Sequence, residues 1–451
     1  MKAFETGKTS ELHKEYDSTP LGRIEAMTRK QLIDCEVPVD FPESVVNQTE
    51  SDLCVEASAH HRDLRNLYCL TIDSADTKDI DDAISLERTG NCYKLYVHIA
   101  DVATYAPPNS EYESIALNRG TSIYLPHLTI PMLPSILSDH LCSLNPSEDK
   151  LAITAIITLD LQGKVTDFEL TKSQICSRVK GIYSEINELL AGACSPDIKH
   201  KYEDAESMLL EMHRLAMLLR KDREKNGANI HNRLNPKPVF QGTDILFYIE
   251  ESGPAQIIIE EFMVLANRLV AAFLHENKLP VIYRVQEKAR QEAVYAATEI
   301  HHAELALERY SHFTSPIRRL SDLKIHQVLT AFLMGIDNET IWAMFGNSMK
   351  EAAELATVGE RRSDNITRPC LRYCSGLFLM SQVRNEFDAV AIGYMKKNQV
   401  LFYLRKNGIT VPGIEGLKPK IGQRFAVKLA IADEEKAIVN VVSCIPIRRA
   451  A

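Results

Sequence analysis

Apolar residues follow two different periods along the chain, and these predict strands in some segments and helices in others. Residues 68–73 and 92–101 are rich in β-branched and aromatic residues with the alternation of half-buried strands. Residues 151–170 read as two strands joined by a turn at Gln162–Gly163. The chain from residue 68 onward therefore begins as a β-rich segment.

Helical periodicity dominates the centre of the chain. Residues 202–227 carry one apolar stripe at helical spacing and end at Asn226–Gly227, a typical helix terminus. The stripe consists of Met208, Met212, Leu215 and Leu219. The same periodicity predicts helices over residues 255–278, 317–335 and 339–377.

Strand character returns near the end of the sequence. Residues 386–446 contain about five short strands, which predicts a small β-barrel. Residues 1–66 are polar and have few sustained apolar patterns. We therefore expect an N-terminal extension of uncertain structure (1–66), a large α+β body (67–378) and a C-terminal barrel (379–451).

Composition adds little about the substrate but constrains the class of protein. The chain has 451 residues, 45% hydrophobic and 25% charged, as in ordinary globular proteins. A net charge of −9 neither indicates nor excludes a nucleic-acid partner, because a local groove can be basic on an acidic protein. The ten cysteines form no CxxC pair, so we interpret them as reduced thiols. With no signal peptide or membrane span in the sequence, we expect a cytoplasmic protein.

One short segment, Thr71–Glu87, concentrates negative charge between two predicted strands. Its aspartates are Asp73, Asp76, Asp79, Asp81 and Asp82. Carboxylates this close repel one another unless they are solvated, protonated or bound to a divalent cation. An EF-hand is excluded, because counting from Asp73 the sixth position is Lys78 and the twelfth is Ile84. The cluster alone leaves an acidic surface turn and a metal site about equally probable.

A second segment, Tyr310–His326, combines aromatic, hydroxyl and basic residues. Ser315 followed by Pro316 predicts a helix start, with Arg318 and Arg319 in the first turn. Cations are disfavoured there, which suggests that they bind a phosphate together with the helix N-terminus. The hydroxyl of Thr314 or Ser315 would assist, and Tyr310 would offer a ring for base stacking. The alternatives are an Arg–Asp322 ion pair and a tyrosine that belongs to the core.

Together the two segments resemble the motifs of the ribonuclease II and ribonuclease R family, whose RNB catalytic domain degrades RNA from its 3′ end. The resemblance covers roughly residues 60–378 and includes the long block Tyr96–Pro146. The stretches IIIEEFMVLANRLVA (257–271) and YRVQE (283–287) also match. It implies an RNB-type domain around an RNA channel, followed by an OB-fold barrel. It also implies a short member of the family, without the usual pair of N-terminal cold-shock domains.

The resemblance assigns roles residue by residue. Asp73, Asp79 and Asp82 match metal ligands, and Asp81 matches the carboxylate most closely tied to the chemical step. Arg318 matches the arginine at the scissile phosphate, and Tyr124 matches the aromatic that stacks on the 3′-terminal base. Glu261 resembles, more loosely, a glutamate near the terminal ribose, with a plain surface carboxylate as the alternative.

The barrel is expected to follow the RNA backbone with basic side chains, although a solvated strand face is the alternative. These side chains are Lys396, Lys397 and Arg405. Four features depart from the family pattern: the stretch His302–Tyr310 in place of a Gly-Phe-Gly-like segment, and Gln286, Pro369 and Tyr373 in place of His, Asp and Trp. None of these departures removes a predicted metal ligand or Arg318.

The resemblance thus implies a 3′-to-5′ exoribonuclease that uses Mg²⁺, with Mn²⁺ as the alternative ion, in a two-metal mechanism. Its partner would be single-stranded RNA with a free 3′ end, and its product 5′-mononucleotides. One alternative is a catalytically silent relative that binds RNA. The other is a metal phosphodiesterase that acts on DNA or short oligonucleotides.

Overall fold

The central feature of the larger part of the molecule is a mixed β-sheet. The structure is a computed structural model that describes residues 18–53, 55–230, 235–250, 252–395 and 398–447. Within these ranges the sheet has seven strands in the order β1-β8-β7-β4-β3-β2-β9. In chain order they are β1 (His61–Asp63), β2 (Leu70–Asp73), β3 (Asp82–Thr89), β4 (Cys92–Ala100), β7 (Asp149–Asp160), β8 (Val165–Cys176) and β9 (Val179–Ile182). The pairs β1–β8 and β2–β9 are parallel, and the other neighbours are antiparallel.

The strands predicted from alternation are confirmed. β2 and β4 cover the two predicted strands, and β7 and β8 form the predicted hairpin. Its turn includes Gly163, whose φ of 81° lies in the left-handed region that glycine tolerates best. The sheet starts at β1, earlier than the expected boundary at residue 67, because His61–Asp63 pair with Lys172–Gln174 of β8.

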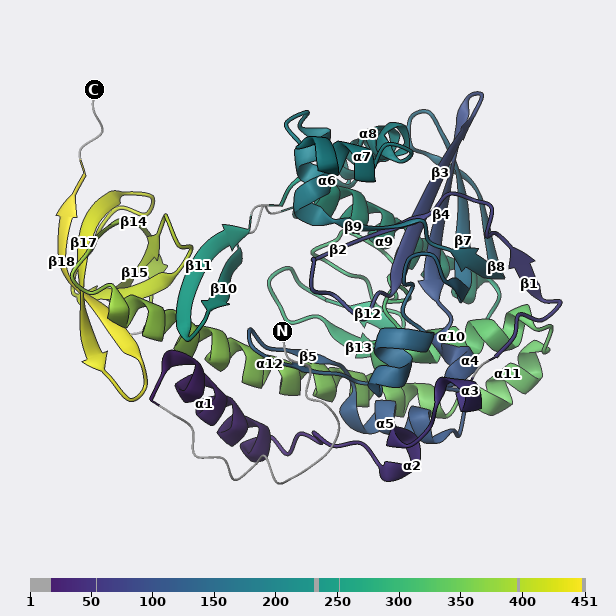
Figure 1. Ribbon diagram of the computed structural model, residues 1–451, viewed down its shortest axis with the longest axis horizontal. Coiled ribbons are helices and arrows are strands. Elements are labelled where there is room, and N and C mark those ends of the chain that lie inside the picture. Colours follow the sequence, from purple (N-terminus) through teal and green to yellow (C-terminus); the bar gives the residue numbers. More distant parts are fainter. Residues whose placement is uncertain (1–17, 54, 231–234, 251, 396–397, 448–451) are drawn as a thin grey trace.

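Helices of the middle segment cover this sheet (Figure 1). They are α6 (Tyr183–Leu190), α7 (Pro196–Lys201), α8 (Glu206–Lys225) and α9 (Pro254–Glu276). The stripe predicted for α8 is confirmed, since Met212, Leu215 and Leu219 are buried and Met208 is partly buried in the main core. The helix predicted over 255–278 corresponds to α9.

Two helix predictions need correction. The helix predicted from residue 317 begins later, as α10 (Leu320–Leu333), because residues 316–318 form a turn. The single helix predicted over 339–377 is two helices, α11 (Asn338–Phe345) and α12 (Ser348–Ser381), separated at Gly346–Asn347. α12 runs along the molecule to the C-terminal barrel (Figure 1). It comes so close to the backbone at Gly120 that a Cβ on Gly359 would lie 2.7 Å from the Gly120 Cα.

Short elements complete the walls around the sheet. The helical ones are α4 (Val102–Tyr105), α5 (Glu111–Arg119) and a π-helical turn at Ile136–Leu141. The others are the two-stranded pairs β5 (Ile123–Tyr124) with β6 (Thr129–Ile130), and β12 (Tyr283–Val285) with β13 (Val294–Ala296).

The N-terminal segment is helical where it is described. It contains α1 (Pro20–Asp34), α2 (Glu43–Val46) and α3 (Glu50–Leu53). The hydroxyl of Thr19 caps α1 by accepting a hydrogen bond from the Gly22 N–H at 3.1 Å. α1 lies along α12 (Figure 1), and its Ile24 and Leu32 are buried in a second core that α12 and the barrel share.

The C-terminal part is the expected small barrel. Within the described residues its sheet has five strands in the order β16-β15-β14-β17-β18. They are β14 (Glu386–Tyr394), β15 (Gln399–Leu404), β16 (Thr410–Glu415), β17 (Arg424–Asp433) and β18 (Ile438–Pro446). The outer strands β16 and β18 contact each other, which closes the sheet. A hairpin of β10 (Asn235–Gln241) and β11 (Asp244–Glu250) lies between barrel and body (Figure 1), and the predicted α+β class is confirmed.

None of the helices in the described ranges has an apolar stretch long enough to cross a bilayer.

An ion pair is buried between Asp101, which follows β4, and Lys172 on β8. Asp101 Oδ2 lies 2.6 Å from Lys172 Nζ, and both side chains are almost fully inaccessible to solvent. The hydroxyl of Thr104 donates to Asp101 at 2.7 Å, and the His61 ring lies at 3.9 Å. Burial alone would raise the pKa of Asp101, but contacts with His61, Lys172 and Thr104 outweigh it and hold that pKa below its usual range.

Replacing Asp101 by Asn should lower the free energy of unfolding by about 3–5 kcal/mol, because Lys172 would keep a buried, unpaired charge. Since the pKa of Asp101 is lowered on folding, the stabilisation is present above about pH 4 and is lost as the pH falls further. Urea denaturation of the Asp101→Asn variant and of the Asp101→Asn/Lys172→Met double variant measures both effects. Equal losses in the two variants would contradict the explanation, since the double variant leaves no unpaired charge.

Candidate active site

The acidic loop connects two neighbouring strands, so its first and last aspartates lie close together. Asp73 ends β2 and Asp82 begins β3, which pair antiparallel in the sheet. Lys180 on β9 fixes the loop by donating to the carbonyls of Ala75 and Thr77 at 3.0 and 2.6 Å. The hydroxyl of Ser143 donates to the Lys78 carbonyl at 2.6 Å and accepts from the Ile80 N–H at 3.1 Å. The loop is therefore part of the folded framework and not a solvated surface turn.

The second segment forms a turn and not a helix start. Ser315 does not cap α10, which begins at Leu320. Instead the Ser315 carbonyl accepts from the backbone N–H of Arg319 at 3.0 Å, and its hydroxyl accepts from Arg318 Nη2 at 2.8 Å. The predicted helix start at Ser315 is therefore wrong, and the two arginines lie in the tight turn that leads into α10.

Asp81 connects the two segments. Its Oδ1 accepts a hydrogen bond from the Ile317 N–H at 2.8 Å, and its Oδ2 lies 3.2 Å from Arg318 Nε. The Asp81 side chain is 3% exposed, whereas that of Arg318 is 40% exposed. The guanidinium of Arg318 is thus held on its inner side and open on the other. The alternative pairing of Arg318 with Asp322 does not occur.

Arg319, in contrast, is paired within its own segment. Its Nη2 lies 2.7 Å from Asp322 Oδ1, which also accepts from the Ser315 N–H at 2.8 Å. Asn267 of α9 holds the preceding residues: its Oδ1 accepts from the Phe313 N–H at 2.7 Å. The hydroxyl of Thr314 accepts from Arg319 and Asn267, each at 3.4 Å, so it supports these side chains directly.

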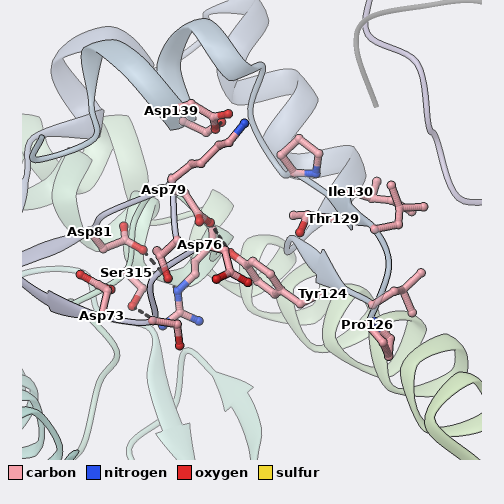
Figure 2. A pocket seen from close by; sticks show the side chains of 18 of the residues that line it. Asp73, Asp76, Asp79, Asp81, Tyr124, Pro126, Thr129, Ile130, Asp139 and Ser315 are labelled. Atoms are coloured by element: carbon pink, nitrogen blue, oxygen red, sulfur yellow. Dashed lines mark hydrogen bonds and ion pairs between the residues drawn. The ribbon is translucent and has the colours of Figure 1, made fainter. Parts of the chain in front are cut away.

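Tyr124 belongs to the same site. Its hydroxyl donates a hydrogen bond to Asp79, while 39% of the residue remains exposed. Figure 2 shows Tyr124 and Asp79 facing each other, with Asp73, Asp81 and Ser315 nearby. Asp76 is exposed, as expected for a solvated carboxylate.

Burial and mutual repulsion disfavour the charged forms of the acidic side chains. Burial is the main cause that raises the pKa of Asp73, Asp79, Asp81 and Asp82. The charge of Asp81 further raises the pKa of Asp73, and the charge of Asp73 raises that of Asp82. Arg318 opposes the shift in all four. An added cation would relieve this repulsion.

The donor chemistry of these carboxylates fits a hard divalent cation. The Oδ2 atom of Asp73 is buried and has no hydrogen-bond partner. In the part of the chain that the structure describes, no three Asp, Glu, His or Cys side chains converge as a ready-made metal cage. Mg²⁺ does not require one, because it commonly keeps several waters and binds one or two carboxylates together with substrate phosphates.

The site opens into a cavity of about 2130 Å³. Asp73, Asp79, Asp81 and Asp82 line it together with Tyr124, Thr314, Ser315, Arg318 and Arg319. Further parts of its wall come from α1 and the loop that follows it, α6, α9, α12, the β5–β6 segment, the π-helical turn and the β10–β11 hairpin. Pockets for small ligands measure about 300–1,000 Å³, so this cavity has room for a segment of a polymer.

Three predicted RNA-binding residues have other roles in this structure. Glu261 does not line the cavity but is buried beneath α8, where its Oε2 lies 3.1 Å from Arg223 Nη1. Burial raises the pKa of Glu261 to about 7, against the opposing charges of Arg223 and Arg220. Tyr310 lines the cavity but is only 5% exposed, and its ring packs edge-on against His302 and His312.

In the barrel, Arg405 Nη1 lies 2.9 Å from Asp388 Oδ2, which also contacts Arg424. Arg405 is therefore partly neutralised and lies outside the cavity lining. Lys396 and Lys397, predicted to follow the RNA backbone, lie outside the described residues.

Several residues of the site were not predicted from the sequence. Asn267 and Lys180 hold the two segments, and Glu260, not Glu261, lines the cavity. One signal for Asn267 was available, since it is a polar residue within the apolar run of α9. Lys180 gave no comparable signal, because its contact with the acidic loop depends on the parallel pairing of β2 and β9.

Comparison with known proteins supports the resemblance to an RNB catalytic domain. The RNB domain model matches residues 61–294 and 287–335. The chain belongs to the RNB domain family. It is 30% identical to ribonuclease R of Escherichia coli strain K12 over 421 residues, which cover 79% of this chain and 52% of that protein. The chain thus spans about half the length of this curated relative.

Solved structures show the same fold. Mycoplasma genitalium RNase R in complex with ribose-methylated single-stranded RNA has a TM-score of 0.81 at 23% identity, with 94% of this chain and 78% of that chain covered. Yeast Ssd1, described as a pseudonuclease, has a TM-score of 0.66 at 15% identity, with 91% and 58% covered. The fold therefore occurs in nucleases and in at least one protein without nuclease activity.

Asp322 should be the main support of the arginine turn. Replacing it by Ala removes the acceptor for the Ser315 N–H and leaves Arg319 unpaired, so we expect a loss of about 3–5 kcal/mol in the free energy of unfolding. Replacing it by Asn keeps an oxygen for the Ser315 N–H, and the loss should be smaller. Urea denaturation of both variants measures the difference, and an equal loss would show that the backbone contact contributes little.

Proposed function

We propose that the protein is a Mg²⁺-dependent 3′-to-5′ exoribonuclease that hydrolyses single-stranded RNA to 5′-mononucleotides. The observation that carries the proposal is the contact of buried Asp81 with Arg318 at the wall of a polymer-sized cavity, within an RNB domain. A buried carboxylate cluster beside an arginine suits phosphodiester cleavage, in which negative charge builds up on the phosphate oxygens.

In this proposal each side chain has a separate task. Arg318 contacts the scissile phosphate with the exposed side of its guanidinium, while Asp81 and Ser315 fix its orientation. Asp73, Asp79 and Asp82 would hold Mg²⁺, or Mn²⁺ as the alternative. When bound, such ions activate water and stabilise the leaving oxygen. Asp81 would act on the phosphate through Arg318, which it orients while it also accepts from the Ile317 N–H.

Tyr124 would hold the 3′-terminal base. Its ring is partly exposed in the cavity, and its hydroxyl is fixed by Asp79, so the ring is oriented before RNA binds. Stacking tolerates all bases, which suits a nuclease that removes successive nucleotides regardless of sequence. A preference for RNA over DNA would come from contacts with the 2′-hydroxyl.

A catalytically silent RNA-binding protein is the second candidate, and the resemblance to a pseudonuclease fold favours its inclusion. The four aspartates and Arg318 distinguish the two candidates, because a silent relative is expected to lose at least one of them. This chain has all five, lining one cavity. A phosphodiesterase that acts on DNA or short oligonucleotides is a third candidate, which a DNA oligonucleotide of the same sequence tests.

Replacing Asp81 by Asn should lower the rate of mononucleotide release at least about 100-fold, because it removes the negative charge that orients Arg318 and supports the reacting phosphate. The assay uses 5′-labelled single-stranded RNA with Mg²⁺, and EDTA should abolish the activity of the parent. Asp76→Asn is the matched control, since Asp76 is an exposed aspartate on the same loop. If Asp81→Asn kept the activity of the parent, the proposal of an exonuclease would be contradicted. The same holds if the parent released no mononucleotide.

Replacing Tyr124 by Ala should weaken the binding of RNA 3′ ends by about 1–3 kcal/mol, the usual contribution of one base–aromatic stack. Tyr124→Phe keeps the ring and removes only the hydrogen bond to Asp79, so it should retain most of the affinity. Fluorescence anisotropy with labelled RNA measures both variants. Equal losses would assign the effect to the hydroxyl and not to stacking.

A further inference from the structure

The N-terminal segment forms part of the cavity that contains the site. Arg29 of α1 and Phe41 of the following loop line the same cavity as Asp81 and Arg318. This segment precedes the residues that the RNB domain model matches, which begin at 61. Figure 1 shows α1 beside α12, away from the strands β2 and β3 that carry the aspartates. The segment therefore contributes a wall at a distance from the proposed point of cleavage.

This wall is firmly attached to the rest of the molecule. Arg23 of α1 donates to the Tyr373 hydroxyl at 3.2 Å and to the Glu434 carbonyl at 2.5 Å, which joins α1 to α12 and to the barrel. Tyr373 is one of the positions at which the chain departs from the family pattern. Arg119 donates to the Asp40 carbonyl at 2.9 Å and lies 3.8 Å from the centre of the Phe41 ring. These contacts hold α1 and the loop that follows it in a defined position.

Arg29 is a cationic side chain on this wall that has no ion pair among the described residues. Its Nε is buried without a hydrogen-bond partner. Glu25 lies one helical turn earlier and also lines the cavity, yet it does not pair with Arg29. An arginine without an ion pair at a cavity wall is unfavourable, and an anion that enters the cavity would pair with its guanidinium.

We propose that Arg29 binds a backbone phosphate of the RNA strand, several nucleotides from the nucleotide that is cleaved. This inference rests on the proposed function, because it requires that RNA occupy the cavity. The cavity is long enough to connect the two places, since one continuous space touches both Arg29 and Arg318. The contact would recognise the charge of the strand and not its sequence.

A comparison with Lys30 separates this role from general electrostatic attraction. Lys30 follows Arg29 on α1, is exposed, and does not line the cavity. Both residues carry one positive charge at nearly the same position of the chain. A phosphate contact inside the cavity should therefore depend on Arg29 alone, whereas an attraction to the whole surface would respond to both.

The test measures binding of single-stranded RNA to the full chain carrying Asp81→Asn, so that the RNA stays intact. Fluorescence anisotropy is recorded with oligonucleotides of about 4 and about 16 nucleotides, over a series of salt concentrations. The Arg29→Ala, Arg29→Gln, Arg29→Lys and Lys30→Ala variants are compared, and thermal melting confirms that each is folded.

We expect Arg29→Ala and Arg29→Gln to weaken binding of the long RNA about 3- to 10-fold and to leave the short RNA unchanged. The slope of log affinity against log salt should fall by about 0.7, the value for one lost phosphate contact on a single strand. Arg29→Lys should keep most of the affinity, and Lys30→Ala should match the parent.

An unchanged affinity for the long RNA, an equal loss for both lengths, or an equal loss in Lys30→Ala would each overturn the role of Arg29. If the Asp81→Asn chain with Arg29 intact bound neither RNA, the proposed function would be overturned, and this inference with it. The two failures are therefore distinguishable in one experiment.

Discussion

The contact of Asp81 with Arg318 and the Ile317 N–H is the interaction on which the rest of the site depends. It joins two segments that lie 236 residues apart in the chain. Without it, the acidic loop would be a set of mutually repelling carboxylates, and Arg318 would have no fixed direction. With it, a negative and a positive group are held at one wall of the cavity. Asp81 is buried while Arg318 remains partly open, so the pair presents its positive side to an incoming anion.

Such a contact requires that both segments be held from behind. Lys180 and Ser143 bind the backbone of the acidic loop, and Asn267 and Asp322 bind the backbone of the arginine turn. These supports come from β9, α9, α10 and the loop before β7, which all lie around the main core. These contacts explain why the site lies in a folded framework and not on a mobile loop. Because they hold the backbone, the side chains of both segments can face the cavity in fixed positions.

The sequence predicted the elements better than it predicted their contacts. The α8 stripe, the β7–β8 hairpin and the barrel follow from periodicity, because each buries one face of a regular element. The helix start at Ser315 was wrong, since Asp322 takes the Ser315 N–H and makes a turn more favourable than an earlier helix. Glu261 was placed in the site from its position in a motif alone. Both Glu260 and Glu261 pair with arginines of α8, but neighbouring residues of a helix face different directions, so Glu260 also lines the cavity whereas Glu261 is buried.

The same reasoning separates the two ends of the cavity. At the aspartates, Asp81 is paired with Arg318 and burial raises the pKa of the carboxyl groups, as the proposed chemistry on one phosphate requires. At the other end, α1 is joined to α12 and the barrel through Arg23, Tyr373 and Glu434. Arg29 of α1 has no ion pair among the described residues. A strand that reaches from one end to the other would meet a fixed cation at each. The distance between them is then set by α12, because this helix carries the attachment of α1 at Tyr373 and also packs against the backbone at Gly120, which leads into Tyr124.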